Sequence, residues 1–345
     1  MVNQKLSELT ILQPDDWHLH LRDGRTMQTV APISAEIFRR AIIMPNLVPP
    51  ITTVEQCRAY RDRIIDAVPD FEPLMTLYMT HELSAQTIKE AATCDFIHGV
   101  KLYPQGITTN SDQGVTSVET IYHVLEAMQQ FDMPLLVHGE SIDKSLDVFD
   151  REKHFIEHSF MPIRKQFPEL RIVFEHITTS DAVQYVEDND AYMAATITPH
   201  HLLYTRSDLF EGGLRPHRYC LPLPQRERHR STLIQAACSG QKCFFLGTDS
   251  APHARSEKES SCGCAGVFNA PVAMGVYASI FEENQKLDKL EQFACINGPR
   301  FYKLPINTKQ IKLVKKTERV AETIGDEEIV PMLAGQKLEW IIENG

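Results

Sequence analysis

Eight short apolar segments, each followed by a loop and most by a stretch with helical spacing, constrain the fold of this chain more than any other feature. The eight segments are residues 16–21, 41–44, 74–80, 100–103, 134–138, 171–177, 192–198 and 243–247. Continuous apolar runs of this length are typical of strands that are buried on both faces of a parallel sheet. Eight strands alternating with helices can close a barrel, so we predict an α/β fold, a (β/α)8 barrel of the TIM type.

Apolar residues at three- and four-residue spacing predict helices between these strands. The helices are expected over residues 54–68, 118–131, 149–167, 181–188 and 226–238. Residues Thr178 to Asp181 supply N-cap chemistry for one of them, and Gly240 ends another. A doubly wound open sheet is the competing fold, but no Gly-x-Gly-x-x-Gly follows an early strand.

The last forty or so residues depart from this alternation. Residues 311–320 and 328–342 are mixed in charge and contain β-type runs such as Leu338 to Ile342. We predict one barrel domain over residues 1–345, with residues 306–345 as a C-terminal appendage. A length of 345 residues is ordinary for such a barrel.

Composition limits the classes of function. Apolar residues make up 43% and charged residues 23%, as in soluble globular proteins, and the net charge of −11 disfavours nucleic acid as a partner. The eight cysteines are spread along the chain, which favours reduced thiols over a secreted disulfide framework. There is no signal-peptide pattern and no apolar run long enough to span a membrane. We therefore expect a cytoplasmic protein that does not bind membranes.

Metal-ligating residues gather at the ends of the predicted strands. His18 and His20 are two residues apart, so a strand would project both imidazoles to the same side. In a barrel of this type, the carboxyl ends of all strands open into one shared mouth. There the pair would meet four further groups: Lys101, His138, His176 and Asp249. The sequence therefore predicts a metal site, although a His-x-His pair alone is more often hydrogen-bonded inside a core.

Six such groups exceed what one tetrahedral zinc ion takes, so a pair of divalent ions fits them better. Lys101 is unsuitable as an ammonium, because that group offers no acceptor to a metal. If its neutral amine captures carbon dioxide, the resulting carbamate becomes a carboxylate ligand on a long stem. The alternative is that Lys101 extends along the strand toward water or pairs with an acidic neighbour.

Several motifs resemble the dihydroorotase family, in its shorter bacterial type within the amidohydrolase superfamily. They are Asp16-Trp17-His18-Leu19-His20-Leu21-Arg22-Asp23-Gly24, Met44-Pro45-Asn46, Lys101-Leu102-Tyr103-Pro104, Val137-His138-Gly139-Glu140, Phe174-Glu175-His176-Ile177-Thr178-Thr179 and Gly247-Thr248-Asp249-Ser250-Ala251-Pro252-His253. The resemblance covers nearly the whole chain, with the motifs in order. It implies the reversible cyclisation of N-carbamoyl-L-aspartate to L-dihydroorotate and water, the third step of de novo pyrimidine (UMP) biosynthesis.

The resemblance also implies a role for each site residue. His18 and His20 would hold one zinc and His138 and His176 the other, while N6-carboxylated Lys101 bridges the two. Asp249 would bind the first zinc and act as general base and acid. The implied cofactors are thus two Zn²⁺ per chain and carbon dioxide as the carbamate of Lys101.

Substrate binding is implied for a second set of residues. Arg22, Asn46 and His253 would hold the substrate carboxylate, and the planar guanidinium of Arg22 suits that task. Backbone groups of Leu221 and Ala265 would read the pyrimidine edge, and His138 would also contact the substrate. Thr108 and Thr109 lie in a segment, residues 106–111, that resembles the mobile loop of the family. The implied partners are this small-molecule substrate and a second copy of the chain in a homodimer.

Two other functions remain as alternatives. A hydantoinase-like cyclic amidase would keep the metals but lack the carboxylate-binding set of Arg22, Asn46 and His253. A catalytically inactive scaffold would have lost at least one metal ligand, and none is lost here.

Three further groups remain open from the residues alone. Glu140 and Glu175 stand beside proposed ligands and could orient them or be merely structural. Cys262 and Cys264 could form half of a zinc knuckle, but a single Cys-x-Cys favours loop packing beside Ala265.

Overall fold

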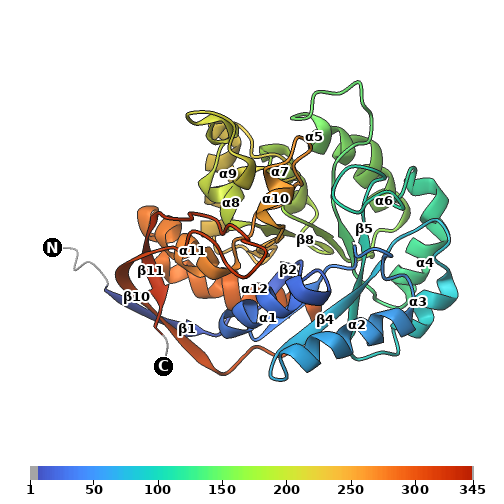
Figure 1. Ribbon diagram of the computed structural model, residues 1–345. Coiled ribbons are helices and arrows are strands. Elements are labelled where there is room, and N and C mark those ends of the chain that lie inside the picture. The colour runs from blue at the N-terminus through green and yellow to red at the C-terminus, as the bar shows by residue number, and fades with distance from the viewer. Residues whose placement is uncertain (1–6, 344–345) are drawn as a thin grey trace.

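The computed structural model describes residues 7–343 and contains the predicted barrel (Figure 1). Eight parallel strands follow each other in chain order around one sheet. They are β2 (Asp16–Leu19), β3 (Arg40–Ile43), β4 (Glu72–Tyr78), β5 (Ile97–Leu102), β6 (Leu135–Val137), β7 (Ile172–Phe174), β8 (Met193–Ile197) and β9 (Phe244–Leu246). Backbone hydrogen bonds join the two ends of the sheet: Asp249 N–H donates to His18 O at 2.8 Å and His20 N–H to Ser250 O at 3.1 Å. Each predicted strand segment coincides with one of these strands, which confirms the (β/α)8 fold.

Most of the helices surround the strands (Figure 1). The helices are α1 (Gly24–Ile37), α2 (Val54–Ala67), α3 (Ala85–Ala91), α4 (Tyr122–Gln130), α5 (Arg151–Phe155), α6 (Met161–Gln166), α7 (Ser180–Asp188), α8 (Pro199–Leu203), α9 (Glu227–Cys238), α10 (Arg255–Lys258), α11 (Ala273–Glu283) and α12 (Asn297–Tyr302). All five predicted helices are present. The predicted helix over 149–167 consists of α5, a π-helical turn over Ile156–Phe160 and α6. Six of these helices were not predicted: α1, which contains Pro32 in its interior, and α3, α8, α10, α11 and α12.

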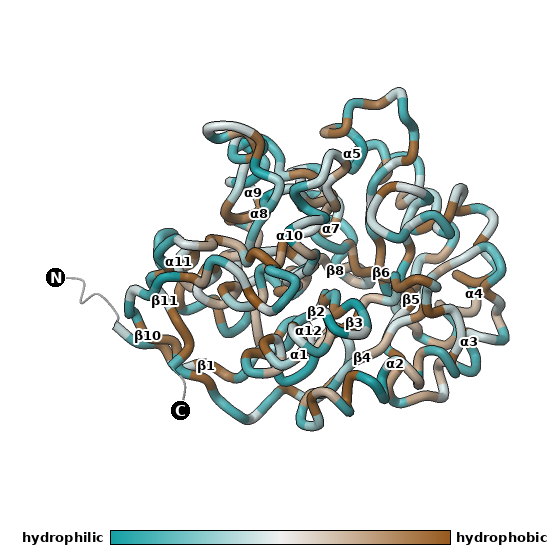
Figure 2. The backbone as a smooth tube through the Cα atoms, in the orientation of Figure 1, coloured by the Kyte–Doolittle hydropathy of each residue, from teal (hydrophilic) through white to brown (hydrophobic). Residues whose placement is uncertain are grey.

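The hydrophobic core has two parts, separated by the wall of the barrel. The larger part packs between strands and helices, and the smaller one fills the interior around Trp17, Leu136 and Phe245. Tyr302 of α12 stacks on Trp17 with ring centroids 4.6 Å apart. Gly298 permits this approach, because a Cβ there would lie 1.9 Å from Nε1 of Trp17. Figure 2 colours the backbone by residue hydropathy, and its hydrophobic stretches coincide with central strands such as β5 and β6.

A small antiparallel sheet forms the appendage, at the left of Figure 1. Its strands are β1 (Glu8–Leu12), β10 (Gln310–Arg319) and β11 (Lys337–Ile342), in the order β1-β10-β11. Trp340 of β11 is fully buried, and its Nε1 donates to Glu282 of α11 at 3.0 Å. The two C-terminal strands match the β-type runs of the sequence, whereas β1 was not predicted. The appendage is therefore built from both ends of the chain.

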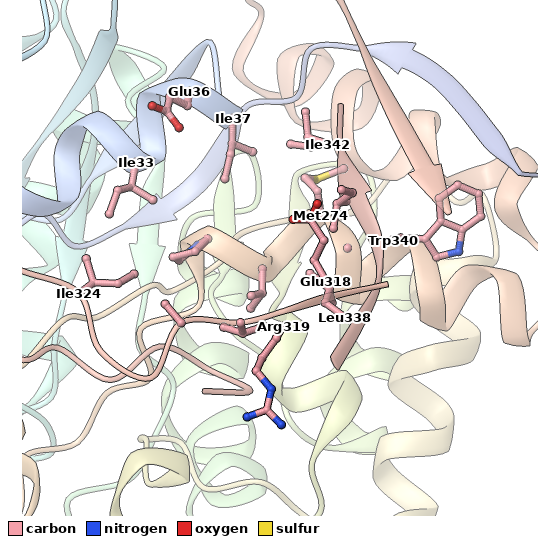
Figure 3. A pocket seen from close by; sticks show the side chains of 16 residues that line it. Ile33, Glu36, Ile37, Met274, Glu318, Arg319, Ile324, Leu338, Trp340 and Ile342 are labelled. Atoms are coloured by element: carbon pink, nitrogen blue, oxygen red, sulfur yellow. The ribbon is translucent and has the colours of Figure 1, made fainter. Parts of the chain in front are cut away.

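A cavity of about 290 Å³ lies between α1, α11 and this appendage sheet (Figure 3). Aliphatic side chains line most of it, among them Ile33, Ile37, Met274 and Ile342. None of the residues at the carboxyl ends of the barrel strands line it, so it is separate from the predicted metal site.

Within residues 7–343, no helix combines the length and apolar character needed to cross a lipid bilayer.

Candidate metal centre and active site

Three predicted ligands meet at the point where the barrel closes. His18 belongs to β2, His20 follows it, and Asp249 comes three residues after the end of β9. The Nε2 atoms of the two histidines are 3.3 Å apart, and Oδ1 of Asp249 lies 3.2 Å from the first and 3.1 Å from the second. Ligand atoms bound about 2.0–2.2 Å from one zinc ion would be separated by roughly 3.0–3.5 Å. The three atoms therefore fit one face of a metal coordination shell.

The other two predicted imidazoles adjoin this group. His138 follows β6 directly and His176 lies two residues beyond β7. The ring centroid of His176 is 5.0 Å from that of His18 and 4.7 Å from that of His138. Both residues are at most 2% exposed. Four imidazoles from three strand ends thus form one buried cluster.

Lys101, on β5, is completely buried among these residues, and its Nζ atom has no hydrogen-bond partner. Burial lowers the pKa of its amine to about 8, and the neighbouring carboxylates Glu175 and Asp249 oppose that shift. A buried amine without a partner is costly unless another group satisfies it. The environment of Lys101 therefore suits a side chain that carries an added polar group.

Protonation within the cluster favours metal binding. Burial lowers the pKa of His20 to about 3 and that of His176 well below its usual value, so both imidazoles are neutral at pH 7. Burial alone would raise the pKa of Asp249, but the adjacent histidines, led by His18, bring it well below its ordinary range. Neutral imidazoles and an ionised carboxylate are the forms that bind a divalent cation.

Two buried carboxylates form hydrogen bonds with predicted ligands. Glu175 Oε2 forms a hydrogen bond with Nδ1 of His18, which leaves Nε2 facing His20. Glu140 Oε2 lies 2.6 Å from Nε2 of His138. Carboxylates in this position fix the tautomer and ring orientation of a metal-binding histidine. The structure thus places both glutamates in the orienting position that the sequence had left open.

Three site residues have left-handed backbone conformations: φ is 60° at Arg22, 41° at His176 and 46° at Asp249. Non-glycine residues rarely adopt this region, and it is maintained only where neighbouring contacts enforce it. Here the His176 N–H donates to Thr196 Oγ1 at 2.7 Å, and the Tyr60 hydroxyl donates to Arg22 O at 2.5 Å. No sequence pattern had indicated these conformations.

A small cavity opens beside the cluster, and predicted substrate-binding residues line it. Its lining includes Arg22, Asn46, Thr108, Thr109, His138, Leu221 and Ala265, together with His18, His20, His176 and Asp249. His253 lies next to this lining, since its Nε2 is 2.8 Å from Nη2 of Arg22 and 3.0 Å from Ala265 O. Every predicted substrate-binding residue therefore lies in or beside one cavity.

The loop over residues 106–111 covers this cavity. Asn46 Nδ2 donates to Thr109 O at 3.0 Å, and Asn110 Nδ2 donates back to Asn46 O at 2.9 Å. Thr109 Oγ1 donates to Ala265 O at 3.3 Å. The loop therefore contacts two other segments beside the cavity, and Thr108 and Thr109 form part of its lining.

Sequence reasoning missed other residues of this region. Tyr103 also lines the cavity, and its buried hydroxyl has no hydrogen-bond partner.

A further cluster, His200, His201 and Cys220, could be mistaken for a metal site. Both ring nitrogens of His201 already have partners there, Thr198 Oγ1 at 2.8 Å and Pro222 O at 2.9 Å. Hydrogen bonding inside the core accounts for that histidine.

Comparison with known proteins gives the family. Residues 15–313 match the model of the amidohydrolase family. The chain belongs to this family. Dihydroorotase from Edwardsiella ictaluri (strain 93-146) is 54% identical over 339 residues, which cover 97% of each protein.

Solved structures agree with that match. Dihydroorotase from Campylobacter jejuni is 39% identical with a TM-score of 0.90, and the match covers 98% of each chain. The Saccharomyces cerevisiae dihydroorotase complexed with 5-fluoroorotic acid is 33% identical with a TM-score of 0.92, covering 98% of this chain and 99% of that one. The prediction of a cyclic amidohydrolase of the dihydroorotase type is thereby confirmed.

Proposed function

We propose that this chain interconverts N-carbamoyl-L-aspartate and L-dihydroorotate, as the dihydroorotase activity of its relatives implies. One observation carries the proposal at the level of chemistry. Four imidazoles and the ionised Asp249 line a cavity that has Arg22 in its wall, and the buried, unpartnered amine of Lys101 adjoins His176 and Asp249. Such a site combines metal ligands with a binding group for a substrate carboxylate.

The donor set fits two zinc ions. His18, His20 and Asp249 would hold one ion, His138 and His176 the other, and Lys101, carboxylated by carbon dioxide, would join the two. The unpartnered Nζ of Lys101 supports this assignment, because a carbamate there would use the amine and bring two oxygen acceptors to the cluster. When bound, the ions would supply Lewis acidity for the ring carbonyl and lower the pKa of a nearby water.

The remaining steps belong to side chains. Asp249 is ionised, so it can take a proton from the attacking water and deliver it to the ring nitrogen as the C–N bond breaks. Arg22 and Asn46 would bind the substrate carboxylate, together with His253. Leu221 and Ala265 would offer backbone groups to the amide edge of the ring, and Thr108, Thr109 and His138 complete the contacts. In the reverse direction, the same groups close the ring with loss of water, which is the direction of pyrimidine synthesis.

The alternatives are weaker on specific observations. A hydantoinase-like substrate lacks the carboxylate that the pairing of Arg22 with His253 is placed to bind. An inactive scaffold would not need the complete ligand set, nor the two glutamates that orient it. Both alternatives remain testable outcomes of the assay below.

The test is an absorbance assay of L-dihydroorotate hydrolysis combined with metal analysis. We expect the purified protein to hydrolyse dihydroorotate, to prefer it over hydantoin and to contain about two zinc ions per chain. Lys101→Ala should lose both activity and zinc, whereas Lys242→Ala, a surface control that pairs with Asp190, should lose neither. Asp249→Ala should abolish activity, and a fully active Asp249→Ala protein would refute the assigned base.

We also propose, from the family resemblance, that the protein is a cytoplasmic homodimer. Multi-angle light scattering after size-exclusion chromatography should give twice the mass of one chain. A single-chain mass at micromolar concentration would contradict the dimer and leave the activity proposal intact.

A further inference from the structure

Lys258 is a buried cation outside the predicted catalytic set. It is the last residue of α10, its residue exposure is 4%, and its Nζ lies beneath the loop that contains Ala265. Nζ donates to three backbone carbonyls: Tyr219 O at 2.8 Å, Cys264 O at 2.7 Å and Gly266 O at 2.7 Å. An ammonium has three N–H donors, so every one of them is used.

These carbonyls belong to two segments that line the cavity from different parts of the chain. Cys264 and Gly266 flank Ala265, and Tyr219 precedes Leu221 by two residues. A hydrogen bond from Gly266 N–H to Tyr219 O, at 3.0 Å, also joins the segments directly. Lys258 therefore ties together the two backbone stretches assigned to the amide edge of the substrate.

The loop that contains Ala265 and Gly266 has little room to shift if the hydrogen bonds from Lys258 are lost. Gly266 has φ of +149°, and a Cβ there would lie 2.9 Å from Ala251 Cβ and 3.0 Å from His253 Cδ2. Ala265 O in turn lies within hydrogen-bond distance of both His253 Nε2 and Thr109 Oγ1. A shift of the loop would thus move the carboxylate-binding histidine and the covering loop together.

We propose that Lys258 is a positioning residue for the substrate: its ammonium fixes the backbone of Ala265 and Leu221 so that their polar groups face the pyrimidine edge. The inference rests on the proposed function, because it takes Ala265 and Leu221 as substrate contacts. Lys258 itself touches neither the substrate nor the metal ligands. Its removal should therefore weaken binding without emptying the metal site.

The experiment compares Lys258→Met, Lys258→Gln and the surface control Lys242→Met. Each holoenzyme is measured for KM and kcat with L-dihydroorotate, for the dissociation constant of 5-fluoroorotate by calorimetry, and for zinc content. The Met side chain has no hydrogen-bond donor and the Gln side chain has two N–H donors. KM is therefore expected to increase from the wild type to Lys258→Gln to Lys258→Met. We expect KM and the 5-fluoroorotate dissociation constant to rise at least tenfold in Lys258→Met, with kcat changed less than threefold and zinc retained.

The outcomes separate this inference from the proposed function. If the wild-type protein and Lys242→Met fail to hydrolyse dihydroorotate, the function itself is wrong. If they are active and Lys258→Met keeps the wild-type KM and 5-fluoroorotate affinity, the positioning role is overturned. If Lys258→Met does not fold, Lys258→Gln alone provides the test. The proposal is overturned if the KM of Lys258→Gln equals the wild-type value. It is also overturned if KM rises and the zinc content falls together.

Discussion

The two ring nitrogens of His18 have different neighbours, and this difference explains the role of the buried Glu175 beside it. Its Nδ1 is bonded to Glu175, while its Nε2 faces His20 and Asp249. Because the Glu175 carboxylate engages Nδ1, Nε2 is the ring nitrogen left to face a metal. The glutamate thereby prepares the histidine as a ligand.

Arg22 gives a prediction at the scale of single residues. Its Nε donates to Pro252 O at 3.1 Å, and its Nη2 lies 2.8 Å from His253 Nε2, so the guanidinium is held in place. Arg22→Met should raise the KM for L-dihydroorotate about 10- to 100-fold, because a hydrogen bond to a charged group contributes about 1.5–3 kcal/mol. Steady-state kinetics with metal analysis measures this change. A KM at the wild-type value would remove Arg22 from substrate binding.

The roles of some single residues could not be predicted, because their hydrogen-bond partners lie far away in the sequence. Five of the six predicted ligands could be proposed because they stand at or just after the end of an apolar strand, and Lys101 because it lies inside one; the barrel fold brings all six to one mouth. Glu175 was ambiguous, since nothing in its own segment showed that it would reach His18, 157 residues earlier. Lys258 was not predicted at all, because it binds backbone carbonyls, which leave no trace in the sequence.

Among the elements, α5 and the start of α7 are joined by one buried carboxylate. Glu152 of α5 accepts hydrogen bonds from Thr178 N and Oγ1, at 2.9 and 2.8 Å, and from Thr179 N and Oγ1, at 2.8 and 2.6 Å. Thr179 in turn caps α7 by accepting from Ala182 N–H. This connection fixes the turn that follows His176.

Replacing Glu152 tests that connection. Glu152→Gln puts an amide N–H₂ opposite donors, so at least one buried donor loses its acceptor. We expect the free energy of unfolding to fall by about 1–3 kcal/mol, the usual cost of such a group. Glu157→Gln, on the exposed side of the same helical segment, is the matched control and should change it by less than about 0.5 kcal/mol. Equal urea midpoints for the two variants would show that the carboxylate is not needed there.

The loop over residues 106–111 gives a second prediction for an element. Its hydroxyl and amide contacts to Ala265 and Asn46 hold it over the cavity. Thr109→Ala should lower kcat about three- to tenfold with zinc retained, because one hydrogen bond of the closed loop contributes about 0.5–1.5 kcal/mol. Stopped-flow and steady-state assays measure the turnover. An unaltered rate would count against a role for this loop in catalysis.

Strands were more predictable than the other elements for a physical reason. A parallel strand buried on both faces must be apolar throughout, so each barrel strand stands out as an uninterrupted run. β1 instead alternates exposed and buried positions, and its partner β10 is about 300 residues away in the chain. Likewise, α1 contains Pro32, which favours a helix end or kink when the sequence is read alone.

At the scale of the whole molecule, closure of the barrel creates the site. The hydrogen bonds between residues 18–20 and 249–250 join the first and last strands, and they bring His18, His20 and Asp249 together. Tyr302 and Trp17 fill the interior beneath, so the ligands rest on a packed core. The closed barrel and its packed interior therefore support the residues proposed to hold the metal ions.

The most direct test of this account is an anomalous difference map at the zinc absorption edge from crystals of the purified protein. We predict two peaks about 3.5–4 Å apart, the usual spacing of paired metal ions. His18, His20 and Asp249 should surround one peak, His138 and His176 the other, and extra density should extend from Lys101 Nζ toward both. A single peak, or two peaks beside an unmodified Lys101, would contradict the account.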